Sequence, residues 1–333
     1  MNKKVLVLGG TGALGTYLVP ELIKMKYRVD VVSLDKKESD NPDLNFIQRD
    51  AKDFVFLNEI LKNEYCAIVD FMVYFSVEEF EKYSNLFLNS TDHYIFTSSY
   101  RVYADSAIPI TEESPKLLDI SKDKNFLSSG DYSLYKAQEE NLLIGSGKRN
   151  WTILRPTITY SQSRFQLTIL EARVFIWRML NKKTVVLPEP AMDIQGTLSW
   201  AGDFGKMVAR LVCNPYAKGE IYTVGTSEHH TWKELAMIYK KIGNLNFITT
   251  DTESFLNIVD PGNIHTRQQL IYDRYFNRAI DNKKILAASG FRQEDLTTVE
   301  NGLTFELSKF SIDQIPIDKK VNDRMNEFLL KQN

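Results

Sequence analysis

Residues 5–15, VLVLGGTGALG, constrain the fold more than any other stretch of this chain. Four apolar residues predict a short buried strand, and Gly9, Gly12 and Gly15 follow at three-residue spacing before a helical pattern begins. Glycines at such a turn let the backbone approach a diphosphate, whose charge faces free N–H groups and the positive end of the helix dipole. The segment therefore predicts a dinucleotide site, with an ordinary strand–turn–helix as the alternative.

Asp35 supports the dinucleotide interpretation. It stands about 20 positions after Gly15, at the end of a second expected strand over residues 28–34, where a carboxylate meets the adenosine ribose. A carboxylate there also repels a 2′-phosphate, so we expect NAD as the cofactor. Lys36 and Lys37 follow directly and leave NADP as an alternative.

Strand and helix patterns alternate through the first half of the chain. Besides the two strands above, strands are expected over residues 45–50, 67–72, 93–99 and 151–156, and helices over 12–25, 54–63, 77–89 and 132–144. Residues 104–130 predict a loop over the site. This alternation favours an α/β fold, a Rossmann-type doubly wound parallel sheet with helices on both faces.

The second half has a looser rhythm. Helices are expected over residues 165–180, 200–213, 231–242 and 283–289, and short strands over 184–187 and 221–225. A chain of 333 residues is long for one small core. We expect a dinucleotide-binding domain over residues 1–160 and a smaller substrate-binding lobe over residues 161–333 that is partly interleaved with the first.

Composition narrows the function classes. Hydrophobic residues make up 43% and charged residues 25% of the chain, as in ordinary globular proteins. A net charge of −2 gives no general attraction to nucleic acids or anionic membranes. Cys66 and Cys213 fit no ligand spacing, and we expect buried thiols in a reducing cytosol rather than a disulfide. The apolar start is too short for a signal peptide and no stretch approaches a membrane span, so we expect a cytoplasmic protein.

Tyr132 and Lys136 are the first candidates for chemistry. They stand four apart on an expected helix, so both side chains lie on one face. A tyrosine hydroxyl titrates near about 10, and a nearby ammonium favours the phenolate. Such a tyrosine can exchange a proton with an alcohol or carbonyl as hydride moves. Ser99, at the end of the strand over 93–99, can hydrogen-bond the reacting oxygen; a solvated helix face and a backbone-satisfying hydroxyl are the alternatives.

Together, these motifs resemble the extended short-chain dehydrogenase/reductase family, the NAD-dependent epimerases and dehydratases. The resemblance is carried by the glycine turn, residues 97–103 (TSSYRVY), residues 132–136 (YSLYK) and residues 154–156 (LRP) in this order. It implies that Ser99 positions the substrate oxygen, Tyr132 is the acid/base, and Lys136 binds the nicotinamide ribose and lowers the tyrosine pKa. The implied cofactor-binding set is Gly9, Thr11, Gly12, Ala13, Leu14 and Gly15 at the diphosphate, Asp35 at the ribose, Asp50 and Ala51 at the adenine, and Tyr132, Lys136 and Pro156 at the nicotinamide.

The chain departs from the family pattern at three places. Tyr100 and Arg101 replace the Asp–Glu pair of sugar-nucleotide 4,6-dehydratases, so no dehydratase activity is expected. We expect Arg101 to pair with Asp105 at the surface, with an anionic group of the substrate as the alternative partner. Ile158 and Gly196 replace an Asn and an Arg that often contact the substrate. The arginines that could take over these substrate contacts are Arg164, Arg173, Arg267 and Arg274.

The resemblance favours an NAD-dependent epimerase acting on a sugar or sugar nucleotide through a transient keto intermediate. A net NAD(P)-dependent sugar reductase or dehydrogenase is the first alternative, and a non-catalytic nucleotide- or RNA-binding protein on the same fold is the second. No metal site is expected, because the adjacent His229 and His230 point in different directions. The family also implies a homodimer through helices 77–89 and 132–144, with an apolar stripe of Phe80, Phe87, Leu142 and Leu143.

Overall fold

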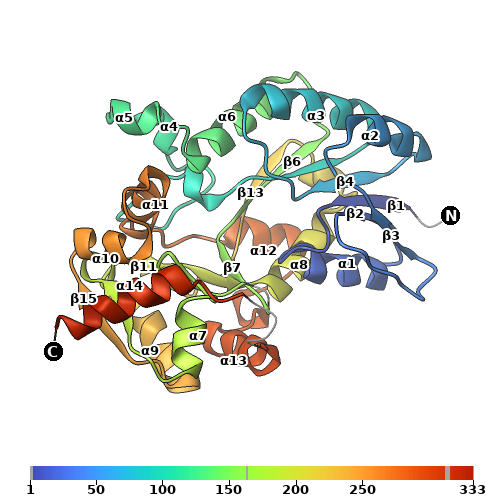
Figure 1. The fold of residues 1–333 in the computed structure, drawn as a ribbon. Coiled ribbons are helices and arrows are strands. Elements are labelled where there is room, and N and C mark those ends of the chain that lie inside the picture. The colour runs from blue at the N-terminus through green and yellow to red at the C-terminus, as the bar shows by residue number, and fades with distance from the viewer. Residues whose placement is uncertain (1–2, 163, 312–315, 333) are drawn as a thin grey trace.

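A parallel sheet of seven strands organises the computed structural model, which describes residues 3–162, 164–311 and 316–332 (Figure 1). The strand order is β13-β6-β5-β4-β1-β2-β3. Strands β2 and β3 are added on one side of β1 and β4 to β6 on the other, so the order of strand addition reverses beside β1. The strands are β1 (Lys4–Leu8), β2 (Arg28–Ser33), β3 (Leu44–Gln48), β4 (Ala67–Asp70), β5 (Tyr94–Thr97), β6 (Trp151–Pro156) and β13 (Glu220–Val224). The predicted Rossmann-type fold class is confirmed.

Helices cover both faces of this sheet (Figure 1). One face carries α1 (Gly15–Lys24), α8 (Ala201–Leu211) and α12 (Lys283–Ser289), and the other carries α2 (Phe54–Ile60), α3 (Val77–Ser90) and α6 (Tyr132–Gly145). Strand residues alternate between the two cores: Val5 and Val7 pack with α1 and α8, while Leu6 and Leu8 pack with α2 and α3. Burial on both faces explains why β1 is apolar from Val5 to Leu8.

Strand β13 belongs to the main sheet although it lies in the second half of the chain. It pairs with β6 in parallel, Ile221 opposite Ile153. Its side chains Tyr222 and Val224 are buried in the core that α8 shares with α1. The second half thus completes the first, in line with the interleaving expected, while a domain boundary at residue 160 stays a prediction.

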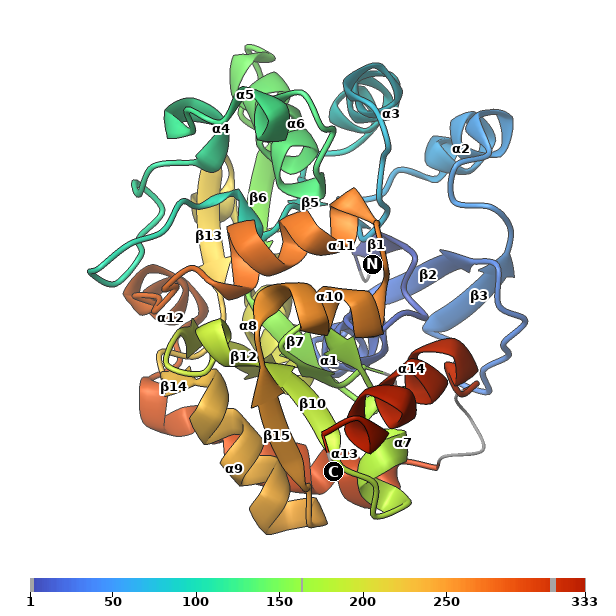
Figure 2. The same ribbon diagram turned by 60° about the vertical axis from the view of Figure 1, so that its left-hand side comes forward.

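The remaining elements form a second layered body around a core of their own (Figure 2). Phe175, Trp232, Tyr239 and Phe255 are fully or almost fully buried there. Its strands are β7 (Ile158–Tyr160), β10 (Val185–Pro188), β11 (Gln195–Gly196), β12 (Leu198–Trp200), β14 (His230–Thr231) and β15 (Phe247–Thr250), and its helices include α9 (Trp232–Gly243), α10 (Thr252–Val259), α11 (Ile264–Gln269), α13 (Val299–Lys309) and α14 (Lys319–Leu330). Strands pair two by two: β7 with β12, β10 with β15, β11 with β14.

The helix expected over residues 165–180 is only partly present. Its first half is a small antiparallel hairpin of β8 (Gln166–Leu167) and β9 (Leu170–Glu171), and only α7 (Phe175–Leu180) is helical. Thr168 has a φ of +52°, which a helix does not allow. Arg274 donates to the Thr168 carbonyl (2.8 Å) and to the Gln166 side chain (3.2 Å), so a distant residue fixes the hairpin.

The loop expected over residues 104–130 contains two one-turn helices, α4 (Leu117–Ile120) and α5 (Lys124–Leu127). They are anchored by a small cluster in which Leu117 and Phe126 pack on Leu134 of α6. Asp123 caps α5 by accepting the N–H groups of Asn125 and Phe126. The pattern predicted a loop because neither helix is long enough to show a period.

The expectation of free thiols is wrong, because Cys66 and Cys213 form a disulfide. Cys66 immediately precedes β4 and Cys213 follows α8 by two residues, and their Cα atoms lie 6.2 Å apart. The two residues are 147 positions apart in sequence. Their proximity arises only when α8 packs on the sheet, which a spacing argument could not foresee.

The expected dimer stripe is also wrong as an exposed surface. Phe80 and Phe87 of α3 and Leu143 of α6 are at most 1% exposed, and they pack into the core beneath these helices. Only Leu142 is partly exposed. The periodic apolar face of α3 and α6 therefore serves the chain's own sheet. A homodimer through these two helices stays a prediction.

Candidate active site

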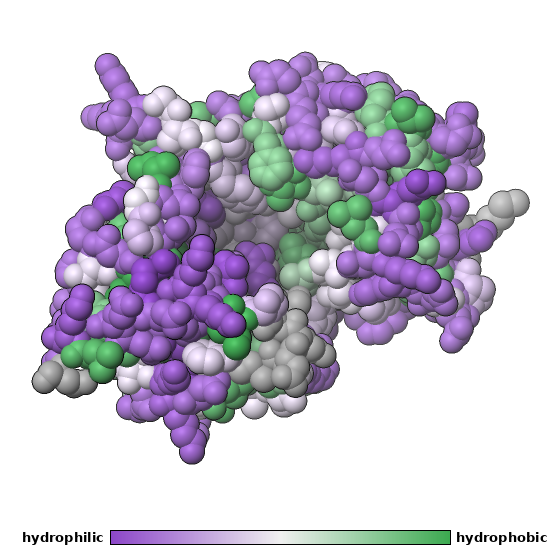
Figure 3. All heavy atoms as spheres, in the orientation of Figure 1, coloured by the Kyte–Doolittle hydropathy of each residue, from purple (hydrophilic) through white to green (hydrophobic). Residues whose placement is uncertain are grey.

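A cavity of about 420 Å³ lies at the carboxyl ends of β1, β4, β5 and β6. The molecular surface is hollowed there, between the sheet and the C-terminal elements (Figure 3). The cavity brings together predicted residues that are far apart in sequence: Gly9, Gly12, Ala13, Leu14, Gly15, Ser99, Tyr132, Lys136 and Pro156. An edge of this kind, where the strand order reverses, is the usual ligand position in open parallel sheets.

The glycine turn fits a diphosphate. Gly9 has a φ of +72°, a conformation that side chains rarely adopt. A Cβ on Gly15 would lie 2.4 Å from the backbone of Gly10, so only glycine lets α1 begin this close to the turn. Residues 12–15, which lead into the N-terminus of α1, line the cavity, and a helix N-terminus suits a bound anion. Thr11 does not line the cavity, and it shares a hydrogen bond with Ser33 (2.7 Å).

Besides Thr11, three predicted cofactor residues lie outside this cavity. Asp35 is exposed just beyond β2, and its N–H donates to Ser33 Oγ (2.9 Å). Asp50 is exposed after β3 and accepts the N–H of Lys52 (2.8 Å), while Ala51 is buried. These positions follow neighbouring strands on the side of β1 away from Tyr132. A long dinucleotide that starts at the cavity can extend toward them.

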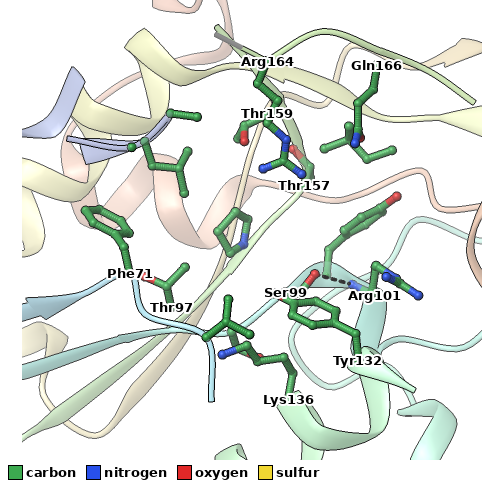
Figure 4. Close-up of a pocket in the computed structure, with 18 of the residues that line it drawn as sticks. Phe71, Thr97, Ser99, Arg101, Tyr132, Lys136, Thr157, Thr159, Arg164 and Gln166 are labelled. Carbon is green, nitrogen blue, oxygen red and sulfur yellow. Dashed lines mark hydrogen bonds between the residues drawn. The ribbon is translucent and has the colours of Figure 1, made fainter. Parts of the chain in front are cut away.

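Ser99 lies where β5 gives way to a single 3₁₀ turn (Tyr100–Val102). Its Oγ accepts the N–H of Arg101 (3.2 Å) and caps this turn, so the hydroxyl is fixed at the cavity (Figure 4). The neighbouring Ser98 hydroxyl is already engaged, because its Oγ donates to the buried Glu140 side chain (2.6 Å). Ser99 is therefore the serine of this pair that can reach a ligand.

Tyr132 and Lys136 both come from the first turns of α6, as predicted. Asp131 caps the helix by accepting the N–H of Ser133 (2.8 Å). The Lys136 ammonium lies 5.9 Å from the centre of the Tyr132 ring, and the Arg101 guanidinium lies 5.3 Å from the same centre. Figure 4 shows Ser99, Tyr132 and Lys136 along one wall of the cavity. A hydroxyl acid/base beside a cation is thus available at the edge where a substrate would sit.

Lys136 has a partner that sequence reasoning missed. Its Nζ lies 2.9 Å from Oε2 of Glu139, and both side chains are at most 1% exposed. Burial raises the pKa of Glu139 to about 7, since the attraction of Lys136 offsets only part of the desolvation and Asp70 and Glu140 add repulsion. The spacing of three positions on a helix was the available signal.

Arg101 does not pair with Asp105, contrary to expectation. Its guanidinium contacts Asp131 and Asp273, each at 3.3 Å, and it is mostly buried. Tyr100 is also buried and donates its hydroxyl to Asp273 (3.0 Å). Asp105 instead accepts the backbone N–H of Asn277 (2.6 Å). The surface pairing was inferred from sequence proximity, whereas the partners of Arg101 come from α6 and from residues 270–274.

The arginines proposed as substrate contacts separate into two groups. Arg173 and Arg267 lie outside the cavity and pair with Glu171 and Glu253. Arg274 lines the cavity but is fully engaged by Thr168, Gln166 and Asp273. Arg164 also lines the cavity and makes no ion pair with a residue that the structure describes; Figure 4 shows its guanidinium pointing inward. Arg164 is therefore the cation available to an anionic substrate.

The histidines serve local structure. His230 contacts the Glu228 side chain (2.8 Å) and His229 contacts the Ile280 carbonyl (3.0 Å). Across residues 3–162, 164–311 and 316–332, no three His, Cys, Asp or Glu side chains gather as metal ligands would. In the same residues, no helix combines the length and the apolar character that crossing a membrane requires.

Comparison with known proteins gives three kinds of match. The profile of the NAD-dependent epimerase/dehydratase family matches residues 5–225. The chloroplast stem-loop binding protein of 41 kDa b from Arabidopsis thaliana is 26% identical over 257 residues, a match covering 73% of this chain and 64% of that protein. This chain thus spans slightly less than two thirds of that relative.

Solved structures share the fold at low identity. UDP-glucuronic acid 4-epimerase from Bacillus cereus, in complex with UDP-glucuronic acid and NAD, superposes with a TM-score of 0.67 at 15% identity, covering 92% of this chain and 98% of the enzyme. A short-chain dehydrogenase/reductase superfamily protein from Agrobacterium tumefaciens with bound NAD gives a TM-score of 0.66 at 15% identity, covering 99% of each chain.

Proposed function

Since the chain belongs to the NAD-dependent epimerase/dehydratase family, we propose that it is an NAD-dependent epimerase that inverts one hydroxyl-bearing carbon of a sugar nucleotide through a transient keto intermediate. The observation that carries the proposal is the meeting of Ser99, Tyr132 and Lys136 with the glycine turn in one cavity. When bound at that turn, NAD accepts a hydride and returns it.

The roles of the chain's own residues follow from their positions. Tyr132 takes the hydroxyl proton while the carbon is oxidised, and returns it when the opposite face is reduced. Ser99, fixed by its contact with Arg101, donates a hydrogen bond to the reacting oxygen. Lys136 holds the cofactor ribose and keeps a positive charge near the phenol. Rotation of the keto sugar between the two half-reactions then exchanges its faces.

The choice of an epimerase over a dehydratase rests on Tyr100 and Arg101. Elimination of water needs an acid and a base beyond the tyrosine, and both side chains at these positions are engaged by Asp273. A guanidinium also cannot act as a base at neutral pH. We therefore propose interconversion at a single carbon.

The substrate is proposed to be anionic. Solved structural neighbours include complexes with UDP-glucuronic acid and NAD, and with NAD and UDP. In this chain, Arg164 offers an inward-pointing guanidinium on the wall opposite Tyr132 (Figure 4). It is suited to a carboxylate or phosphate oxygen of the substrate.

The test is conversion without added cofactor. Purified protein is incubated with UDP-glucuronic acid, UDP-glucose or UDP-N-acetylglucosamine and the sugar protons are followed by NMR. We expect an epimer to accumulate with no net NADH, and no epimer with the Tyr132→Phe variant. Stoichiometric NADH formation would instead support the alternative of a net dehydrogenase.

Cofactor retention provides an independent discriminator. Mass spectrometry should detect NAD released from the denatured protein, because an epimerase regenerates its cofactor within each turnover. An empty site would support a net reductase or dehydrogenase.

Titration with NAD and NADP tests the proposed role of Asp35 at the adenosine ribose, and tighter binding of NADP would contradict that role. A homodimer through α3 and α6 and a cytoplasmic location also stay predictions; light scattering tests the homodimer.

RNA binding is the competing function, and the observation that favours it is the similarity to a chloroplast stem-loop binding protein. The net charge of −2 and the full set of Ser99, Tyr132 and Lys136 argue against it. A gel shift with structured RNA at increasing salt decides: a tight, salt-sensitive shift by protein that converts no sugar nucleotide would replace the proposed activity.

A further inference from the structure

Beside the cavity lies a cluster of buried charges, of which the proposed chemistry uses only Lys136. Three carboxylates, those of Asp70, Glu139 and Glu140, are completely buried on β4 and α6. Two cations face them: Lys136 and Arg155 of β6. Full ionisation would leave one negative charge in excess, which is costly away from water.

The partners divide unequally. Glu140 is matched by Arg155 (2.7 Å) and also accepts the Ser98 hydroxyl. Asp70 accepts the hydroxyls of Tyr74 and Tyr94, both at 2.8 Å, and the N–H of Met72.

Glu139 has only Lys136. Apart from the 2.9 Å ion pair, neither of its oxygens has a hydrogen-bond partner among the residues that the structure describes. The Lys136 ammonium is therefore the one described group of opposite charge that pairs with this carboxylate. That group is the ammonium proposed to hold the cofactor.

We propose that Glu139 is a positioning residue that anchors the Lys136 ammonium through their ion pair, so that the N–H donors of Lys136 point at the cofactor ribose. The inference rests on the proposed role of Lys136. The ammonium forms an ion pair with Glu139 but has no hydrogen-bond partner among the residues that the structure describes, so its three N–H donors stay available to a ligand. Without the anchor, a four-carbon side chain gains rotamer freedom that cofactor binding must remove again.

The anchor depends on the charge of Glu139, which changes near neutrality. Its pKa is raised to about 7 by burial, against the attraction of Lys136 and with repulsion from Asp70 and Glu140. Burial also raises the pKa of Asp70, a change that its hydrogen bonds and Lys136 oppose. The other groups facing the cluster are Tyr74, Tyr94, Tyr132 and Arg155. Below pH about 7 Glu139 is neutral and its attraction for Lys136 is lost, so NAD binding should weaken as the pH falls.

The experiment measures the dissociation constant of NAD by calorimetry at pH 6 and pH 8. We expect native protein to bind NAD several-fold more weakly at pH 6. Glu139→Gln should bind about tenfold more weakly than native protein at pH 8, a size found for residues in contact, with no change between the two pH values. Glu139→Asp, which keeps the charge, should retain the pH dependence. Glu113→Gln, at an exposed carboxylate, is the control and should behave as native protein.

A double-mutant cycle separates the possible failures. If Glu139 acts through Lys136, then Glu139→Gln adds nothing to the loss in Lys136→Met. Additive losses in variants with native circular dichroism would give Glu139 a merely structural role and overturn the inference. Native affinity and pH dependence in Glu139→Gln would overturn it as well. Native affinity in Lys136→Met would instead overturn the proposed role of Lys136 itself.

Discussion

At the scale of single residues, the proposed proton transfer depends on one atom, the hydroxyl oxygen of Tyr132. Replacing Tyr132 with Phe removes that oxygen and leaves the glycine turn and Lys136 in place. We expect turnover to fall by about 10²–10⁴, as for other general acid–base groups, with NAD affinity unchanged. Tyr135→Phe is the matched control, since Tyr135 lies on the same helix but beside Gly130, outside the cavity. Steady-state rates of the two variants should differ by that factor; equal rates would contradict the assignment.

Arg164 and Arg173 offer a second comparison between like residues. Arg164 points into the cavity, whereas Arg173 pairs with Glu171 outside it. Arg164→Gln should raise KM for an anionic substrate about tenfold, because a charge-assisted hydrogen bond contributes about 1.5–3 kcal/mol. NAD affinity should stay the same. Arg173→Gln should leave KM as it is, and a similar KM in both variants would count against Arg164 as a substrate contact.

At the scale of elements, Asp273 fastens the C-terminal half to the active-site turn. It lies in a π-helical turn (Leu270–Arg274) and is contacted by Arg101, Arg274, Arg278 and the hydroxyl of Tyr100. Burial alone would raise the pKa of Asp273, but the three arginines outweigh it and the pKa is lowered. The turn that orients Ser99 is thus held from both halves of the chain.

Asp273→Asn should therefore cost about 3–5 kcal/mol of unfolding free energy at pH 7, as expected when a buried ion pair loses one partner. The contribution of a carboxylate with a lowered pKa is present above its unfolded pKa, about 3.9, and is lost as the pH falls through the folded value. Urea titrations should show the gap to native protein closing below pH about 4. Asp119→Asn, at an exposed carboxylate on α4, should show no gap, and a gap of equal size there would contradict the argument.

Elements with a clear period could be predicted from sequence, and those fixed by distant contacts could not. The strands and helices through residue 156 follow apolar repeats, and the glycine turn, Ser99 and Tyr132 come with them. The hairpin at Thr168 depends on Arg274, and Glu139 matters only because β4 lies beneath α6. The apolar face of α3 was visible, but the pattern could not tell a partner subunit from the chain's own sheet.

At the scale of the whole molecule, the disulfide closes a loop over nearly half of the chain. Cys66 and Cys213 are 147 positions apart. A cross-link that closes so long a loop lowers the entropy of the unfolded chain and adds about 2–5 kcal/mol to the free energy of unfolding. Dithiothreitol should therefore lower the urea midpoint of native protein. The double variant Cys66→Ser/Cys213→Ser should have the urea midpoint of the reduced protein, and dithiothreitol should not change that midpoint. An unchanged midpoint on reduction would show that the pair does not stabilise the fold.

The late position of β13 has a consequence for how the chain is made. A ribosome adding about 5–20 residues per second needs several seconds to pass from β6 to β13, and for that time the edge of β6 has no neighbouring strand. Helix α8, which covers α1, emerges in the same interval. The sheet that carries the glycine turn is therefore incomplete until α8 and β13 have been synthesised. A product that stops near residue 160 would leave the edge of β6 unpaired, and an unpaired edge strand promotes aggregation and chaperone binding.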